Sequence, residues 1–310
     1  MDRIGTRLLF LIVGLPLLIA AAQAKLPILS AFWLVPAQRG EALTSRPSEC
    51  APIPSEASVR ESFEIGRAAF RAPLLIGGKA ARAELACESC HSNGRRNAAF
   101  HFPGLSGDPG TADVTSSIMS SHRGNARFDP RPIPDLAVPV KVSRDPSKRE
   151  LESFIRGLIV EEFDGAEPSP LVLRGLADYV RAIGPCDAPR EPLTVAGLLE
   201  DGRRATVAAG FAWMRGDAAA TRLLISSARS ALGRIDERYA PAGLASDRAA
   251  LRSADLALLA IEQAVDRRAA DVPDRLAAWR ADLARWTPPV LRDEPRSLFN
   301  RSLLEAALAR

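Results

Sequence analysis

The sequence predicts an all-α protein. Aromatic residues make up only 5% of its 310 residues, whereas alanine, arginine and leucine are abundant, and these three favour helices over strands. Apolar residues also recur three and four positions apart in several long segments, which is the spacing of a buried helix face. The 41 basic and 37 acidic residues are spread along the chain. Because they form no basic cluster, we expect no nucleic-acid partner.

Residues 1–24 have the pattern of a secretory signal peptide. Arg3 and Arg7 precede an apolar run over residues 8–22, and small residues follow it at a cleavage-like site. A second apolar stretch extends to about residue 36, so an uncleaved anchor in the inner membrane is the alternative. Both interpretations place the remaining chain in the periplasm, where thiols are oxidised.

The first helix of the folded chain is expected to begin near Ser58. Its apolar face is formed by Val59, Phe63, Gly66 and Phe70. Glycine inside a helix costs about 1 kcal/mol relative to alanine, so we expect a second helix to approach closely at Gly66. The expected partner spans residues 170–183. Its apolar face is formed by Leu173, Leu176, Val180 and Ile183.

Two further segments lie between these helices. Residues 148–163 have helical spacing and stop before Asp164 and Gly165, a helix-ending pair. Glu161 and Glu162 at the end of this helix are expected to be solvated. Residues 100–141 are rich in glycine, proline and aspartate and are expected to be a long loop.

The C-terminal third has a different pattern. After the proline-rich residues 185–192, long helical stripes continue over residues 193–310. Short turns between four or five such helices predict an antiparallel bundle. Trp279 and Trp286 have the spacing of a buried face. Because this part contains neither cysteine nor histidine, we expect it to serve in docking or as a scaffold.

Cys87, Cys90 and His91 form a Cys-x-x-Cys-His motif. Two thiols three positions apart on an opening helix can each bond one vinyl group of a porphyrin, and the histidine can bind its iron. A zinc site would need a second pair of ligands, and the chain has three histidines in all. The motif therefore predicts one covalently attached haem c, with His91 as the iron ligand.

The remaining cysteines, Cys50 and Cys186, lie on either side of this motif. Exported proteins rarely keep two free thiols, so we expect Cys50 and Cys186 to form a disulfide. Two unpaired thiols are the alternative, because spacing alone does not show that the two Cα atoms approach within about 7 Å.

The Gly-x-x-x-Phe helix, the haem motif and a final Leu-x-x-Tyr-Val helix together resemble the class I cytochrome c fold, over residues 50–187. Within that fold the chain is similar to bacterial di-haem cytochrome c peroxidases and the related methylamine-utilisation maturases. The similar stretches are residues 66–70, 89–91, 128–131 and 154–165. Those enzymes carry two haem motifs and this chain carries one. The resemblance therefore implies one half of the family's machinery, followed by the helical bundle.

The second axial ligand of the iron is expected to be Met119, with His101, His122 and an open site as alternatives. Met119 and His122 share a face if residues 115–121 are helical. The resemblance to class I cytochromes implies that residues 102–107 lie on the proximal side, with the Pro103 carbonyl bonded to the imidazole of the motif. This would place His101 on the wrong face, although a distal histidine falls at a comparable distance in the di-haem relatives.

The function expected from these features is electron transfer by a periplasmic mono-haem cytochrome with a redox partner protein. One haem can shuttle an electron without an acid or a base, whereas peroxide cleavage needs an open iron and groups that handle protons. The alternatives are a peroxidase-like or maturase-like oxidoreductase that receives electrons from a partner, and a haem-based sensor. We assign no side chain a catalytic role.

Overall fold

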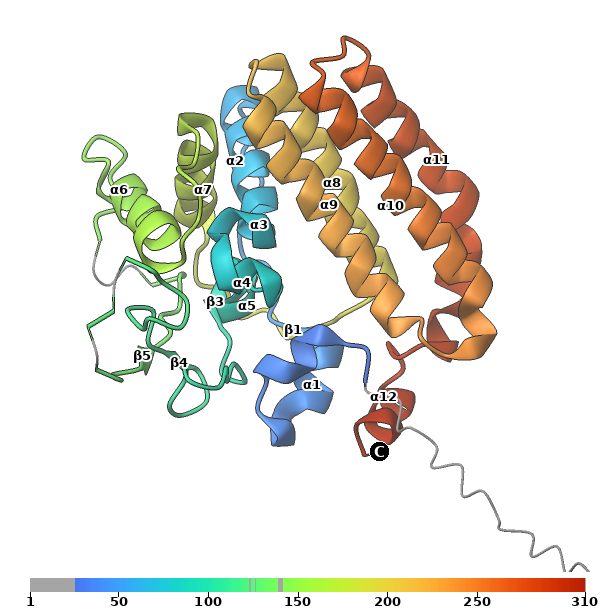
Figure 1. Ribbon diagram of the computed structural model, residues 1–310, viewed down its shortest axis with the longest axis horizontal. Coiled ribbons are helices and arrows are strands. Elements are labelled where there is room, and N and C mark those ends of the chain that lie inside the picture. The colour runs from blue at the N-terminus through green and yellow to red at the C-terminus, as the bar shows by residue number, and fades with distance from the viewer. Residues whose placement is uncertain (1–25, 123, 126, 139–141, 310) are drawn as a thin grey trace, which may run out of the picture.

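The computed structural model describes residues 26–122, 124–125, 127–138 and 142–309 (Figure 1). Helices dominate the fold, and the strands are short two-residue pairs. The predicted all-α class is therefore confirmed. The predicted signal peptide lies outside the described residues. Within the described ranges, no helix is both long and apolar enough to cross a membrane.

The N-terminal described segment folds against the end of the chain. It contains two 3₁₀ turns, Leu29–Trp33 and Pro36–Gln38, and then α1, Arg39–Thr44. Ile28 and Leu34 are buried in a small apolar cluster together with Leu304 of α12, Arg301–Leu308. The second apolar stretch of the sequence is thus folded into the protein and does not form a long helix.

Helices α2, Ala57–Phe70, and α7, Pro170–Ala182, cross in close contact. A Cβ atom placed on Gly66 would lie 1.8 Å from the carbonyl oxygen of Gly175 and 2.7 Å from the amide nitrogen of Leu176. The predicted close approach at Gly66 is confirmed, and the predicted partner helix is the one that makes it. Gly175 is the matching residue on α7, because a Cβ there would also meet the backbone of α2.

The segment between these two helices contains only short elements. Their bounds are α3 Pro73–Ile76, α4 Gly78–Arg82, α5 Cys87–Cys90, β2 His91–Ser92, β3 Arg95–Arg96, β4 Thr111–Ala112, β5 Arg131–Pro132 and α6 Glu150–Gly157. Strands β2 and β3 pair with each other, and β4 pairs with β5. The long loop predicted over residues 100–141 is found, interrupted only by β4 and β5 in its described part.

The helix predicted over residues 148–163 is found. It begins at Glu150 and stops before Asp164, and its last turn, Leu158–Glu162, has π-helical geometry. Residues 115–121 form turns and no helix. The cause is Asp113, whose side chain accepts hydrogen bonds from the backbone nitrogen and the hydroxyl of Thr115, at 3.1 and 2.8 Å. Such a local bond stabilises a turn in competition with the helix.

The C-terminal part forms four long helices that lie side by side (Figure 1). They are α8 Val195–Met214, α9 Ala218–Arg238, α10 Ala245–Asp266 and α11 Val272–Asp293, and we call them the four-helix group. Trp279 and Trp286 are buried, as predicted. The fifth expected helix, α12, lies away from this group and contacts α1.

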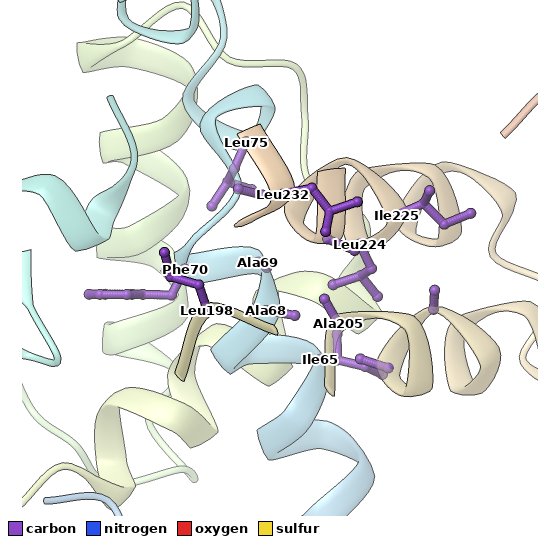
Figure 2. Packing of buried hydrophobic residues seen from close by; sticks show 14 of the residues in the cluster. Ile65, Ala68, Ala69, Phe70, Leu75, Leu198, Ala205, Leu224, Ile225 and Leu232 are labelled. Carbon is purple, nitrogen blue, oxygen red and sulfur yellow. The ribbon is translucent and has the colours of Figure 1, made fainter. Parts of the chain in front are cut away.

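One apolar core joins the four-helix group to α2 and α3. Figure 2 shows Ile65 and Ala68 of α2 and Leu75 of α3 next to Leu198 of α8 and Leu232 of α9. The proline-rich residues 185–192 run across this junction, and their end is strand β6, Glu191–Pro192, which pairs with β1, Ser45–Arg46. The haem motif therefore belongs to a segment that packs directly on the four-helix group.

Candidate haem site

Helix α5 places the two motif cysteines on one helical turn. The side-chain oxygen of Ser89 accepts a hydrogen bond from the backbone nitrogen of Ala86 at 3.0 Å, and the nitrogen of Ser89 donates to the carbonyl of Ala86 at 2.9 Å. This reciprocal pair closes the start of the helix, as in a capping box. Ser89 is therefore needed for the shape of α5, whereas Cys87 and Cys90 remain half-buried beside the apolar core.

Both motif cysteines are free thiols in the structure. Burial raises the pKa of Cys87 and of Cys90 to about 12, so both stay protonated at neutral pH. A site that binds a metal through thiolates, or a reactive redox thiol, would require the opposite shift. The raised pKa values therefore speak against a reactive redox thiol at either position.

His91 is held by a backbone carbonyl. Its Nδ1 atom lies 3.1 Å from the carbonyl oxygen of Pro134, which fixes the ring orientation, and within the described residues Nε2 has no hydrogen-bond partner. Burial lowers the pKa of His91 to about 4, so the imidazole is neutral at physiological pH. A neutral imidazole with one nitrogen anchored and the other unbonded is the form that ligates a metal.

The carbonyl beside His91 corrects a prediction. The sequence placed Pro103 in this role, but the structure gives it to Pro134, which is 43 positions from His91 along the chain. Two neighbouring contacts hold Pro134 in place. The amide of Leu136 donates to the carbonyl of Gly94 at 3.0 Å, and Asp135 forms an ion pair with Arg95 at 2.8 Å. Because Pro134 and not Pro103 lies beside His91, the argument against His101 as the second ligand no longer applies.

The three candidates for the second axial ligand differ in burial. Met119 is 2% exposed and belongs to the apolar core. His122 is on the surface, with 60% of its side chain exposed, and its Nε2 lies 3.8 Å from Asp164. His101 is half-buried, and its backbone nitrogen donates to the carbonyl of Trp33 at 3.0 Å. Since residues 115–121 are not helical, Met119 and His122 do not share a helix face as expected.

The turn that precedes Asp164 contains a buried carboxylate. Glu162 was expected to be solvated, but it is only 6% exposed, because the π-helical turn directs it inward. The hydroxyl of Ser120, the residue after Met119, donates to the carbonyl of Glu161 at 2.5 Å. A buried acid therefore lies on the turn that contacts the Met119 segment, and π-helical turns are frequent at functional sites.

Cys50 and Cys186 form the predicted disulfide, with Cα atoms 6.1 Å apart. The amide of Gly184 also donates to the carbonyl of Cys50 at 2.9 Å. These two bonds join the start of the predicted cytochrome segment to the strap that follows α7. The disulfide leaves Cys87 and Cys90 as the only free thiols in the chain.

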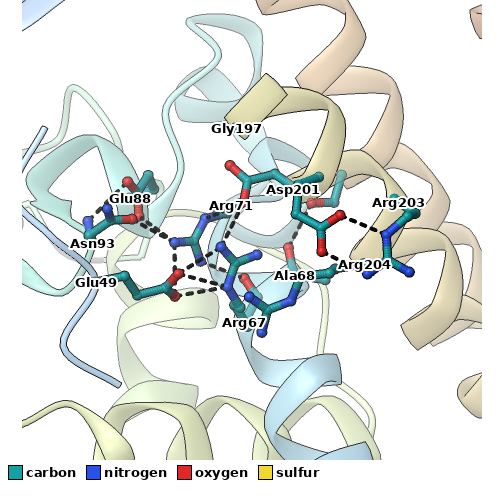
Figure 3. Close-up of polar contacts among 12 residues, drawn as sticks. Glu49, Arg67, Ala68, Arg71, Glu88, Asn93, Gly197, Asp201, Arg203 and Arg204 are labelled. Atoms are coloured by element: carbon teal, nitrogen blue, oxygen red, sulfur yellow. Dashed lines mark hydrogen bonds and ion pairs between the residues drawn. The ribbon is translucent and has the colours of Figure 1, made fainter. Parts of the chain in front are cut away.

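Sequence reasoning missed a buried ionic network behind α5 (Figure 3). Arg67 of α2 and Arg71, the residue directly after α2, both bond the Glu49 carboxylate, at 2.7 and 3.1 Å. Arg67 also reaches Asp201 of α8 at 2.6 Å. Burial alone would raise the pKa of Glu49, but the two arginines outweigh it and lower that pKa to about 2. Burial raises the pKa of Glu88, the residue between Cys87 and Ser89, above its ordinary value.

Within the described residues, no group of three or more histidine, cysteine, aspartate or glutamate side chains is placed to hold a metal ion. The donor set at α5 is of a different kind, with two thiols and one anchored imidazole, and this set fits a covalently bound haem. Compared with known proteins, the chain matches no family model, no curated protein and no solved structure.

Proposed function

We propose that this protein is an exported mono-haem c-type cytochrome that transfers electrons to or from a partner protein. The observation that carries the proposal is the geometry at α5, where two free thiols share one helical turn and His91 has Nδ1 fixed by Pro134, with no partner for Nε2 in the described residues. When bound, haem c supplies a one-electron redox centre. The signal-like residues 1–24 support export to the periplasm, where the attachment takes place.

Each residue of the site then has a separate task. Cys87 and Cys90 tether the porphyrin, His91 binds the iron, and the Pro134 carbonyl holds the imidazole in one orientation. Met119 is our candidate for the second ligand, because a thioether already buried in the apolar core can exclude water from the iron. Methionine ligation raises the reduction potential and suits electron transfer.

Expression of the full chain with its signal, in a host that attaches haem c, tests the proposal. The purified protein is expected to be coloured, to absorb in the Soret region, and to keep its haem on a denaturing gel. The double variant Cys87→Ala/Cys90→Ala is expected to lose all three signals. The matched control is Cys50→Ala/Cys186→Ala, which also removes two cysteines but keeps the motif, and it is expected to retain covalent haem. A colourless wild-type protein of unmodified mass would refute the proposal.

The buried Glu162 supports a second candidate function, a peroxidase-like or maturase-like oxidoreductase. Cleavage of peroxide requires an open iron and a nearby group that handles protons, and Glu162 lies on the turn that contacts the Met119 segment. The spectrum of the ferric protein separates the two functions. An absorption band at roughly 695 nm indicates methionine ligation and favours electron transfer. A high-spin spectrum indicates an open iron and favours the oxidoreductase.

A further inference from the structure

Arg71, at the end of α2, contacts the segment that carries the haem motif. Its Nη2 donates to the side-chain oxygen of Asn93 at 2.8 Å and lies 3.7 Å from Oε2 of Glu88. The backbone nitrogen of Asn93 in turn donates to Oε1 of Glu88 at 3.0 Å. Arg71, Glu88 and Asn93 therefore form a closed triangle around the last turn of α5 and the residues that follow His91 (Figure 3).

Asn93 links the side chains of Arg71 and Glu88 to the backbone that follows His91. It is fully buried, lies two residues after His91, and has a left-handed backbone with φ of 48°. Its side-chain nitrogen donates to the carbonyl of Pro47 at 2.7 Å. Asparagine tolerates this conformation better than other non-glycine residues, and the surrounding contacts keep it there. The bond from Arg71 is one of the contacts that hold it.

The other side of Arg71 faces the four-helix group. Its Nε lies 4.0 Å from Asp201 of α8, and its Nη2 lies 3.1 Å from Glu49. Asp201 is also bonded by Arg46 at 3.2 Å and by Arg67 at 2.6 Å. The contact of Arg71 with Asp201 is thus an ion pair without a hydrogen bond, and Arg71 is also linked to Asp201 through Glu49 and Arg67, so one guanidinium lies between α8 and the turn that follows His91.

We propose that Arg71 is a positioning residue for the haem attachment segment, and that it makes α8 a structural part of the haem site. This inference rests on the proposed function, because it assigns Arg71 the task of holding the segment to which the haem would be attached. In the described part of the chain, the polar partners of Arg71 do not include the attachment cysteines. It acts through Glu88 and Asn93, which fix the orientation of α5 and of the residues after His91, as outer-shell partners do at metal sites.

The test compares Arg71→Gln with Arg204→Gln. Arg204 also joins α8 to α2 by a buried pair, with Nη2 2.7 Å from Glu64, but it has no contact with the attachment segment. Labelling of the full-length chain made without haem reports on Cys87 and Cys90 alone, because the other two cysteines are bonded. We expect Arg71→Gln to accelerate maleimide labelling about 10-fold, which corresponds to about 1.4 kcal/mol of lost local stability, and Arg204→Gln to leave the rate within about twofold.

A second variant keeps the test decisive if Arg71→Gln fails to fold. Asn93→Gly removes the side chain that Arg71 bonds, and glycine adopts a φ of 48° without strain. We expect it to accelerate the labelling in the same direction. In haem-loaded protein, Arg71→Gln and Asn93→Gly are expected to shift the reduction potential, whereas Arg204→Gln does not.

Equal acceleration in Arg204→Gln, or none in the folded Arg71 and Asn93 variants, would overturn the positioning role. A wild-type chain that takes up no haem would refute the proposed function instead. In that case the labelling result still decides whether Arg71 holds the attachment segment.

Discussion

Replacing Gly66 with alanine is expected to destabilise the protein by forcing α2 and α7 apart. The new methyl group would lie 1.8 Å from the Gly175 carbonyl oxygen, and ordinary contact begins at 3.4 Å, so α7 must retreat by about 1.6 Å. The atoms it meets belong to the backbone and have no alternative rotamer. Overpacking typically costs about 1–3 kcal/mol, and we place this case at about 3 kcal/mol after the gain in helix propensity of about 1 kcal/mol.

Thermal unfolding followed by circular dichroism measures this effect. A loss of about 3 kcal/mol is expected to lower the Tm by about 5 °C for a chain of 310 residues. Gly210→Ala is the matched control, because Gly210 lies in α8 and a Cβ there meets nothing within 4 Å. That variant is expected to gain up to about 1 kcal/mol. If Gly66→Ala were as stable as Gly210→Ala, the close helix crossing would be refuted.

Three further predictions follow from the site and its surroundings. The disulfide between Cys50 and Cys186 joins residues 136 positions apart. Its reduction is expected to lower the free energy of unfolding by about 5 kcal/mol through chain entropy. The urea midpoint should therefore be lower in reductant, and an unchanged midpoint would contradict this prediction. Folding lowers the pKa of Glu49, so its contribution to the free energy of unfolding is present above about pH 4.5 and is lost as the pH falls towards 2. The urea midpoint of Glu49→Gln should therefore lack this dependence on acid pH. Met119→Ala is expected to abolish the ferric band near roughly 695 nm, and an unchanged spectrum would exclude Met119 as the ligand.

The sequence predicted the features that have a local signal. Gly66 lies in the middle of an otherwise apolar helix face and indicated the helix crossing. Glycine destabilises a helix interior relative to alanine, so its presence there is explained by the close approach of a second backbone. The motif at Cys87, Cys90 and His91 likewise consists of five consecutive residues. The α5 turn that the motif requires is found in the structure.

Other features lack such a signal. The acceptor for His91 is a backbone carbonyl, which every residue carries, so nothing in the sequence distinguishes Pro134 from Pro103. The segment around Met119 has helical spacing, but the side chain of Asp113 stabilises turns instead. The π-helical turn that buries Glu162 is a change in backbone geometry that apolar spacing does not reveal.

The charged residues behind α5 were the least predictable, because arginines on a helix are usually solvated. Their burial also needs a reason other than stability. A buried ion pair gains little net free energy over apolar side chains of similar volume, whereas removal of one partner leaves an uncompensated charge. The Arg204–Glu64 and Arg67–Asp201 pairs and the shared apolar core already join α8 to α2. The hydrogen bond from Arg71 to Asn93 and its 3.7 Å ion pair with Glu88 lie outside that helix contact. They do constrain the turn beside His91, which is the reason we assign them to the haem site.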